Sequence, residues 1–186
     1  MAKLIYFTPC SLDGFIAGEG EDMGWSMPSD ETFAFMTELV RGTPTYLYGR
    51  KEYETMAVWE RPEAMGGLPE AWWEFARVWG AAEKVVYSRT LERVWTGRTR
   101  VEREFDSGAV REMKSRLGHD ASVGGPALAA EAMRAGLVDE IQLMIVPVVL
   151  GGGKRVLPEG VRLELELVEE RRFENGWVYV RYGVRR

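Results

Sequence analysis

Short apolar runs recur along the chain and alternate with stretches of helical or turn-like patterning. Runs rich in Val, Ile, Leu and Tyr that are bounded by Gly, Pro or Asp are typical of buried strands. They predict strands over residues 3–8, 45–48, 84–87, 98–104, 121–123 and 140–150. Pro147 lies inside the last run and indicates an edge strand or a bulge, because proline cannot donate a hydrogen bond to a strand ladder.

Helical spacing fills most of the intervals between these runs. Ser29 suits the N-cap of a helix in which Phe33 and Met36 begin a buried face that Val40 continues at i+7. Other helices are predicted within residues 49–56, 70–79, 109–117 and 126–135. Strand and helix alternate about four times, which predicts a mixed, mostly parallel central sheet with helices on both faces.

Two stretches of alternating polarity end the chain, at residues 163–170 and 177–184. Asn175 and Gly176 lie between them, and this pair is a strong signal for a hairpin turn. The sheet is therefore expected to end in an antiparallel hairpin. No repeat, low-complexity tract or linker interrupts the sequence, so a single α/β domain over residues 1–186 is expected.

Composition and charge exclude several classes of protein. The chain of 186 residues is 46% hydrophobic and carries a net charge of −5, which argues against nucleic acid as its partner. Cys10 and His119 are the only cysteine and histidine, so neither an internal disulfide nor a zinc site of four Cys and His ligands is expected, and no metal site is predicted. No apolar run is long enough to cross a membrane, and the first residues lack the layout of a signal peptide; a cytoplasmic location is expected.

Three predicted strand ends carry residues suited to phosphate groups. In open α/β sheets, ligands bind beyond the carboxyl ends of the parallel strands. The three segments there are Gly49-Arg50-Lys51, Ser88-Arg89-Thr90 and Gly124-Gly125-Pro126. Bare backbone before a helix suits a diphosphate, and Arg with Ser or Thr suits a phosphate monoester. The segment Ser88-Arg89-Thr90 contains no acid that could hold a ribose hydroxyl, and this absence favours NADP over NAD as the cofactor.

Each segment also has a purely structural interpretation. A Gly-Gly-Pro turn at a helix start serves tight turns, and the two cationic segments are also typical of solvated loops or turn caps. Residues 151–154 (GGGK) look like the end of a P-loop, but Val148 and Arg155 stand where that motif needs Gly and Ser or Thr. Asp30 is the best-placed acid to assist protonation in a hydride transfer, although an acid at a helix start is favourable in any case.

The segments WSMPSD, YGRKEYE, VVYSRTL and VGGPAL follow one another as in the dihydrofolate reductase fold, which the chain resembles. SLDGFIAG and VDEIQLMIVPVVLGGGKRVLPEG are similar to the C-terminal reductase domain of RibD, the riboflavin deaminase-reductase, and its stand-alone relatives. The resemblance covers nearly the whole chain and implies an NADPH-dependent reductase and a homodimer. It implies that the cofactor is bound by Gly49, Arg50, Lys51, Ser88, Arg89, Thr90, Gly124, Gly125, Pro126 and Ala127. The 2′-phosphate would lie near Arg50 and Ser88, and the diphosphate on Gly124 and Gly125, whose peptide bond is often cis in the family. Replacing Gly125 with a bulkier residue is then expected to lower cofactor affinity more than stability.

The resemblance also implies a substrate site, at which this chain departs from the riboflavin reductases. Phe15 stands where those enzymes usually carry a basic residue, and the zinc deaminase half is absent from the sequence. A small, flat heterocycle is expected near Phe15, Trp25, Asp30 and Phe33, with Asp30 as the catalytic acid. Phe33 and Trp59 could line an apolar pocket for it, although core packing is the favoured interpretation for both. The substrate would be a pterin or folate, or an aminopyrimidine of the riboflavin pathway. A non-catalytic NADP(H)-binding protein on the same fold is the alternative, and an acyl- or phosphoryl-transfer enzyme is disfavoured because the motifs for it are missing.

Overall fold

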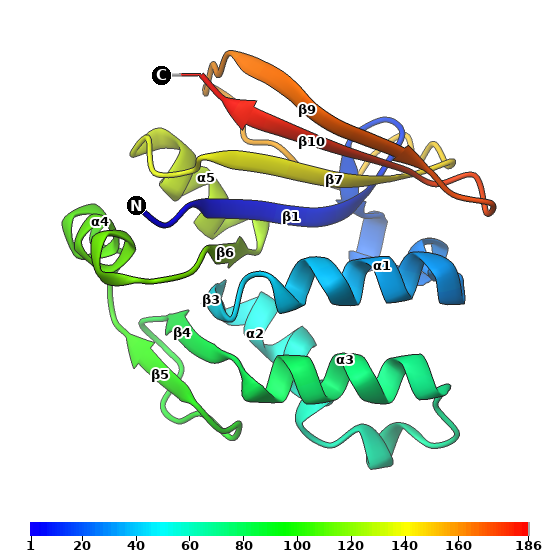
Figure 1. Cartoon of the computed structure of the whole chain (residues 1–186), viewed down its shortest axis with the longest axis horizontal. Helices are drawn as coiled ribbons and strands as arrows, with labels where there is room; N and C mark the ends of the chain where they lie inside the picture. Colours follow the sequence, from blue (N-terminus) through cyan, green and yellow to red (C-terminus); the bar gives the residue numbers. More distant parts are fainter. Residues whose placement is uncertain (186) are drawn as a thin grey trace.

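The computed structural model describes residues 1–185, which form an α/β fold around an eight-stranded sheet (Figure 1). The strand order is β5-β4-β3-β6-β1-β7-β10-β9, and the first six strands are parallel to one another. The strands are β1 (Leu4–Ser11), β2 (Phe15–Ala17), β3 (Thr45–Gly49), β4 (Glu83–Tyr87), β5 (Thr99–Glu102), β6 (Ala121–Gly124), β7 (Glu140–Val146), β8 (Lys154–Arg155), β9 (Leu165–Arg172) and β10 (Val178–Val184). The mixed, mostly parallel sheet predicted from the sequence is confirmed.

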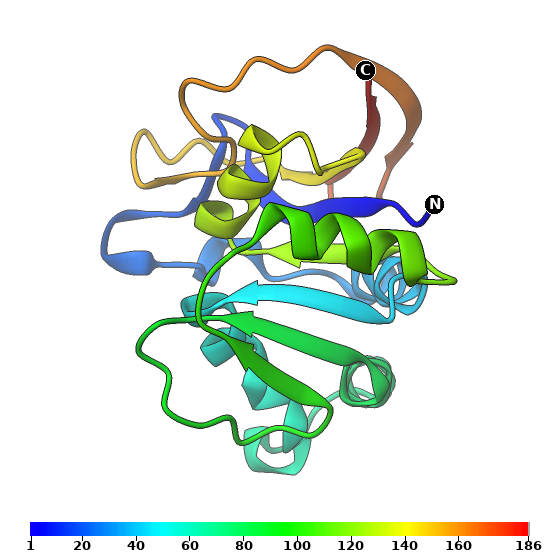
Figure 2. The same ribbon diagram turned by 90° about the vertical axis from the view of Figure 1, so that its left-hand side faces the viewer.

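Helices cover both faces of the sheet, as Figures 1 and 2 show from two sides. The helices are α1 (Asp30–Arg41), α2 (Arg50–Met56), α3 (Glu70–Ala81), α4 (Ser107–Arg116) and α5 (Pro126–Arg134). Helices α1 and α3 pack side by side on one face, and α4 and α5 cover the other. Short 3₁₀ turns at Glu19–Glu21, Gly24–Ser26, Ala57–Glu60 and Pro62–Met65 connect the larger elements.

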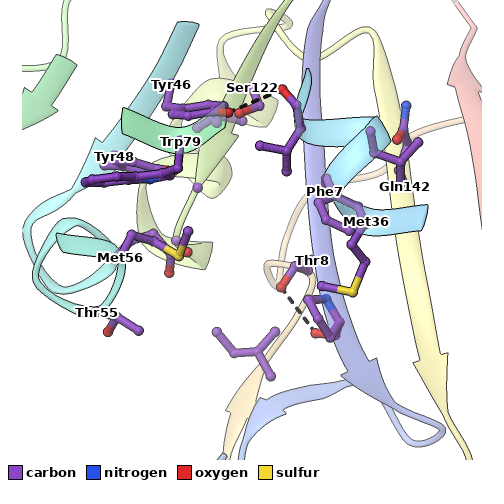
Figure 3. A pocket seen from close by; sticks show the side chains of 18 of the residues that line it. Phe7, Thr8, Met36, Tyr46, Tyr48, Thr55, Met56, Trp79, Ser122 and Gln142 are labelled. Carbon is purple, nitrogen blue, oxygen red and sulfur yellow. Dashed lines mark hydrogen bonds between the residues drawn. The ribbon is translucent and has the colours of Figure 1, made fainter. Parts of the chain in front are cut away.

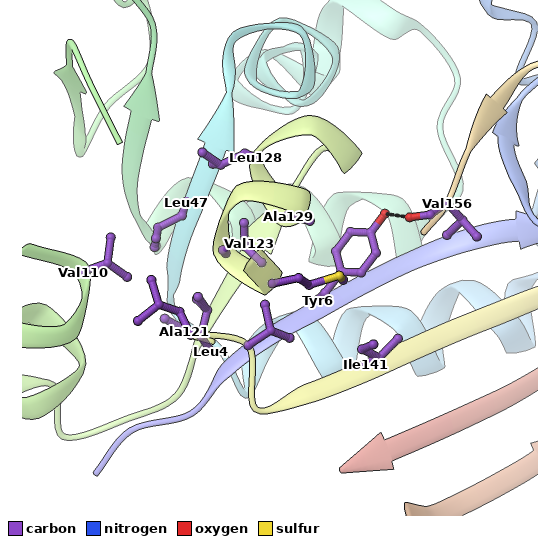
Figure 4. Packing of buried hydrophobic residues seen from close by; sticks show 14 of the residues in the cluster. Leu4, Tyr6, Leu47, Val110, Ala121, Val123, Leu128, Ala129, Ile141 and Val156 are labelled. Carbon is purple, nitrogen blue, oxygen red and sulfur yellow. Dashed lines mark hydrogen bonds between the residues drawn. The ribbon is translucent and has the colours of Figure 1, made fainter. Parts of the chain in front are cut away.

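The period-two alternation of the strands distributes side chains between the two faces. In β1, Leu4 and Tyr6 point toward α5 and join the larger core, whereas Phe7 points toward α1. Figure 4 shows this core with Tyr6 beneath α5 and its hydroxyl donating to the carbonyl of Val156 at 2.9 Å. A central strand must be apolar on both sides because helices cover both of its faces.

Helix α1 begins where the sequence predicts. The Ser29 hydroxyl accepts a hydrogen bond from the Thr32 N–H at 3.3 Å, which satisfies one of the first-turn donors. Phe33 is buried, while Met36 and Val40 are partly buried and face the sheet. Helix α1 therefore covers the middle of one face of the sheet, where it forms one wall of the cavity described below.

The C-terminal hairpin is also confirmed. Strands β9 and β10 are antiparallel and are joined by a turn in which Gly176 has φ of +83° and donates its N–H to the Phe173 carbonyl at 3.0 Å. Strand β10 pairs antiparallel with β7, so the hairpin extends the parallel sheet.

The interpretation of Pro147 as an edge or bulge signal is wrong. Strand β7 ends at Val146, one residue before the proline, and lies between β1 and β10 in the interior of the sheet. Proline is tolerated there because it follows the ladder and removes no hydrogen bond from it.

A second, two-stranded sheet was not predicted. Strand β2 pairs antiparallel with β8, so that Ala17 lies opposite Lys154. A Cβ on Gly153 would lie 2.1 Å from the Ala17 carbonyl oxygen, so the close approach of the two strands requires glycine there. Gly153, the last of the three glycines, therefore serves strand pairing.

Asp13 ties the same two segments together. Its carboxylate accepts hydrogen bonds from the Ser11 hydroxyl at 2.7 Å and from the Leu150 and Gly151 N–H groups at 3.1 and 2.7 Å. The bond from Ser11, with those from the two backbone groups, lowers the pKa of Asp13 to about 2. The loop after β1 is thus held against the glycine-rich loop by an ionised carboxylate.

Candidate functional site

A cavity of about 900 Å³ extends from the carboxyl ends of β3 and β6 to the space between α1 and the sheet. Its wall is formed by β1, β3 and β6 together with α1, α2 and the start of α5. One end carries cations and bare backbone, and the other is largely apolar. This places the cavity where ligands bind in open α/β sheets.

The inner part of the cavity is an aromatic slot, defined by Phe7 and Met36 on one side and by Tyr46, Tyr48 and Met56 on the other (Figure 3). The Tyr46 hydroxyl donates to the Val40 carbonyl at 3.2 Å. Burial raises the pKa of both tyrosines, so their hydroxyls stay protonated. Apolar and aromatic walls on opposite sides suit a flat ring.

Polar groups lie at the deep end of the slot. Ser122, Gln142 and Arg181 line the cavity there. Arg181 donates two hydrogen bonds to Glu140, at 2.8 and 2.9 Å, and Gln142 donates a third at 3.1 Å. Burial raises the pKa of Glu140, but the hydrogen bonds from Arg181, Lys3 and Gln142 outweigh it and lower the value to about 2. These groups were not identified from the sequence, because they lie on strands far apart in the chain.

The two cationic strand ends meet at the outer end of the cavity. Arg50 Nη1 donates to Thr90 Oγ1 at 2.9 Å, and Arg50 Nε donates to Glu54 at 2.7 Å. The Ser88 hydroxyl accepts the N–H groups of Thr90 and Leu91, at 3.3 and 3.0 Å, and so shapes the turn. Arg50 lines the cavity, while residues 88–90 lie beside it without lining it. The structure thus brings together two of the predicted segments.

Arg103 supports this turn and was not predicted from the sequence to be part of the site. Its guanidinium donates to the carbonyl oxygens of Ser88 and Leu91, at 3.2 and 2.8 Å. Arg89, by contrast, has a side chain that is 81% exposed and lies 3.9 Å from Glu104. Such a weakly held cation is free to turn toward a phosphate.

Lys51 pairs with Glu21, which comes from the 3₁₀ turn before α1. Both residues line the cavity, and the hydrogen bond from Lys51 lowers the pKa of Glu21. The pair joins α2 to the segment that leads into α1 and lies at the mouth of the cavity.

The glycine turn, residues 124–127, forms another part of the wall. Gly125 is the N-cap of α5 and offers no side-chain hydrogen bond, so the first-turn N–H groups of Ala127 and Leu128 are left to solvent or a ligand. Gly49 and Pro126 line the cavity as well. The start of α5 therefore has backbone donors beside the cavity, and the diphosphate site there remains a prediction.

Packing within the protein is a second reason for these glycines. A Cβ on Gly124 would lie 2.7 Å from the Tyr48 ring, and Gly125 has φ of +85°. No peptide bond in residues 1–185 is cis, so the cis bond expected between Gly124 and Gly125 is not found. Because a side chain at position 125 strains the backbone at this φ, the expectation that its replacement would affect affinity more than stability has to be revised.

The structure does not bring the predicted catalytic acid into the cavity. Asp30 is exposed at the first position of α1 and is absent from the lining, and the adjacent Glu31 pairs with Arg171 at 3.2 Å. Ser29 supplies the helix cap, and the exposed acids Asp30 and Glu31 lie at the positive end of the helix dipole, where negative charge is favourable. The catalytic role of Asp30 remains a prediction that this position does not favour.

Of the other predicted substrate contacts, only Phe33 lines the cavity. Phe33 stacks on Trp72 with ring centroids 4.7 Å apart, and Trp59 packs beside it. Phe15 is buried beneath Arg155, whose guanidinium lies 5.3 Å from the ring centroid. Trp25 donates to the Asp22 carbonyl at 3.1 Å and packs near the hairpin. Phe15 and Trp25 therefore pack outside the cavity lining, and their contact with a substrate remains a prediction.

Glu52, in the first turn of α2, lines the cavity, as do the acids Glu21, Glu38 and Asp120. Burial raises the pKa of the Glu52 carboxyl, and the nearby Lys154 partly opposes that rise. In the sequence, Glu52 directly follows Gly49-Arg50-Lys51. That segment was interpreted by its cations alone, so the acid beside them was not predicted to be a site residue. A partly buried carboxyl with a perturbed pKa in a cavity is typical of a functional residue.

Within residues 1–185, no three or more His, Cys, Asp or Glu side chains are arranged to hold a metal ion. The same part of the chain contains no helix that is long and apolar enough to cross a membrane.

Comparison with known proteins found a family match over nearly the whole chain. The model of the RibD C-terminal domain family matches residues 2–179. The uncharacterized protein YyaP of Bacillus subtilis (strain 168) is 30% identical over 192 residues, which cover 97% of this chain and 94% of YyaP.

Three solved structures share the fold. A candidate riboflavin biosynthesis protein from Shewanella sp. PV-4 superimposes with a TM-score of 0.76 at 18% identity, covering 100% of both chains. A pyrimidine reductase-like protein from Corynebacterium diphtheriae superimposes with a TM-score of 0.66 at 15% identity, covering 100% of this chain and 92% of the other. The diaminohydroxyphosphoribosylaminopyrimidine deaminase/5-amino-6-(5-phosphoribosylamino)uracil reductase of Thermotoga maritima gives 0.68 at 14% identity, and the match covers 99% of this chain and 57% of that one.

Proposed function

The chain belongs to the RibD C-terminal domain family, and from this premise we propose that it is an NADPH-dependent reductase of a small, flat heterocycle. The observation that carries the proposal is the continuity of the cavity. The same space joins the cationic strand end and the glycine turn to the aromatic slot. A dinucleotide and a ring substrate need such an arrangement to meet.

The residues at the outer end fit the cofactor. Arg50, with Ser88, Arg89 and Thr90 beside it, would hold the 2′-phosphate, because a guanidinium and hydroxyls together offer several donors to a phosphate monoester. The N–H groups at the start of α5 would hold the diphosphate. When bound, the cofactor supplies the hydride, and the protein supplies orientation and electrostatics.

The aromatic slot would take the substrate. Its tyrosine, phenylalanine and methionine walls exclude water from a ring bound between them. Ser122, Gln142 and Arg181 at the deep end would read the ring's polar edge, as the few polar groups of such pockets do. These features fit a pterin or folate, or an aminopyrimidine of the riboflavin pathway, the class named for the Thermotoga maritima protein.

The second candidate is a non-catalytic NADP(H)-binding protein. The position of Asp30 favours it, because the acid expected to assist protonation is exposed outside the cavity. In this candidate the cofactor end of the cavity functions as described and the slot has no productive substrate.

Binding and turnover separate the two candidates. NADPH at about 100 times its Kd should stabilise the protein by about 2.7 kcal/mol and raise the melting temperature by roughly 5–10 °C, with a smaller effect of NADH. Loss of NADPH absorbance with dihydropterin, dihydrofolate or aminopyrimidine substrates would support the reductase. Binding without turnover of any of them would support the second candidate, and no response to NADPH would reject both.

The expected homodimer is part of the proposal and rests on family resemblance. Sedimentation equilibrium tests it directly, since a monomer of 21.1 kDa and its dimer differ twofold in mass.

A further inference from the structure

Glu52 lies against the glycine turn. A Cβ built on Gly125 would be 3.2 Å from Glu52 Cβ and 4.0 Å from Glu52 Oε2, and one built on Gly124 would be 3.0 Å from Glu52 Cγ. The carboxyl group therefore borders the backbone that the proposed function assigns to the diphosphate. Glu52 and both glycines line the same cavity.

The titratable groups that face this carboxyl come from three strands. They are Tyr6 of β1, Tyr48 of β3 and Lys154 of β8, while the glycine turn contributes none. Burial raises the pKa of Glu52, and the charge of Lys154 works in the opposite direction. Burial, aided by Glu52, also raises the pKa of Tyr6 and Tyr48, so these two stay neutral.

In the described part of the chain, neither a hydrogen bond nor an ion pair holds the Glu52 carboxyl. Its neighbour Glu54 pairs with Arg50, and Lys51 pairs with Glu21, so the adjacent cations of α2 are engaged elsewhere. An ionised Glu52 would meet a diphosphate as a like charge in a partly desolvated place, which is unfavourable. A neutral carboxyl would instead offer an O–H donor.

We propose that Glu52 is a binding residue of the diphosphate site that acts in its protonated form, donating its O–H to a phosphate oxygen. This role rests on the proposed function. Binding then takes up one proton from solvent onto the Glu52 carboxylate, and release of the ligand returns it. Lys154, no longer facing a carboxylate, becomes available to the diphosphate. The site thereby favours its ligand at low pH and disfavours it at high pH.

The test compares wild type with Glu52→Gln, because glutamine keeps the shape and a donor but does not ionise. Kd for NADP⁺ is measured by tryptophan fluorescence from about pH 5.5 to about pH 8.5, a range above the ordinary pKa of a glutamate. Wild-type affinity should fall with rising pH by up to about tenfold per pH unit relative to the variant, the limit for one linked proton. The 2′-phosphate, with its second pKa of about 6, titrates in both proteins and cancels in the ratio of their Kd values.

Glu131→Gln is the matched control. Glu131 is exposed on α5 and lies outside the cavity, so its removal should leave the wild-type pH profile unchanged. Calorimetry of the wild-type protein in buffers of different ionisation enthalpy gives a second measurement that needs no variant. It should show net proton uptake, whereas binding of a dianionic 2′-phosphate alone would release protons.

A ratio of Kd values that stays constant with pH would overturn the role of Glu52 and leave the proposed cofactor in place. If Glu52→Gln fails to fold, absence of proton uptake by the wild-type protein at every pH would overturn the role of Glu52 and leave the proposed cofactor in place. Absence of NADP⁺ and NADPH binding at any pH would overturn the proposed function and this role together.

Discussion

Arg50 and Thr90 are 40 positions apart in the chain, yet Arg50 Nη1 donates a hydrogen bond to Thr90 Oγ1 at 2.9 Å. The bond connects the residue after β3 to the turn after β4, because the two strands are parallel neighbours and end at the same edge of the sheet. The guanidinium of Arg50 and the turn that carries the Thr90 hydroxyl therefore lie together at the mouth of the cavity.

Arg50→Ala should therefore weaken NADPH binding by about 10- to 100-fold, since hydrogen bonds to charged groups contribute about 1.5–3 kcal/mol. NADH affinity should change much less, because NADH lacks the 2′-phosphate. Fluorescence titration with both cofactors measures the difference. Arg77→Ala, an exposed arginine of α3, is the control and should affect neither. An equal loss for both cofactors would remove Arg50 from the 2′-phosphate site.

Gly125→Ala should destabilise the protein by about 1–2 kcal/mol, because φ of +85° is unfavourable for a residue with a Cβ. The contact of the new Cβ with Glu52 at 3.2 Å adds to this cost. Urea unfolding gives the free energy directly.

Gly80→Ala is the contrasting variant, because Gly80 lies in α3 with open space around its Cβ position. It should be neutral or stabilising by about 0.5–1 kcal/mol. If Gly125→Ala were as stable as wild type and only cofactor affinity fell, the glycine would be required by the ligand and not by the fold.

Asp30→Asn should change turnover by no more than about twofold, as is usual for exposed positions that lack structural contacts. The carboxylate faces solvent outside the cavity, and Ser29 supplies the helix cap. Ser29→Ala, in contrast, should lower stability by about 1 kcal/mol. Steady-state kinetics on whichever heterocycle proves active decides the matter: a loss of tenfold or more in Asp30→Asn at unchanged melting temperature would restore Asp30 as the catalytic acid.

Glu140 should make stability depend on acid pH. Its pKa lies at about 2, against 4.5 for a free glutamate. A group whose pKa is lowered on folding contributes stability above its unfolded pKa and loses that contribution as the pH falls. The stability should therefore decline between about pH 4.5 and pH 2, by at most roughly 3 kcal/mol.

Glu140→Gln should remove most of that dependence and lower stability at neutral pH, because it leaves Arg181 and Lys3 without their carboxylate partner. Glu112→Gln is the control, since the exposed pair of Glu112 with Arg116 contributes less than about 1 kcal/mol. Identical acid profiles for wild type and Glu140→Gln would contradict the assignment.

Local signals in the sequence were sufficient for most of the fold. The Ser29 side chain caps the N-terminus of α1, and Asn175 with Gly176 forms the turn of the hairpin. These signals act over a few residues, so they do not depend on the rest of the chain. Pairing of β2 with β8 was not predictable, because each strand is very short and the requirement for Gly153 comes from the Ala17 carbonyl on the partner strand.

The candidate site divides in the same way. The sequence by itself determined that cations and glycines follow three parallel strands, and parallel pairing alone then places these segments at one edge of the sheet. Only the tertiary structure decided how these two acids lie: Asp30 is exposed at the start of α1, outside the cavity, and Glu52 lines the cavity, partly buried, beside Gly125. The physical reason is that the environment of a carboxyl depends on which face of its helix packs against neighbouring elements, and for Glu52 those neighbours come from three other strands of the chain.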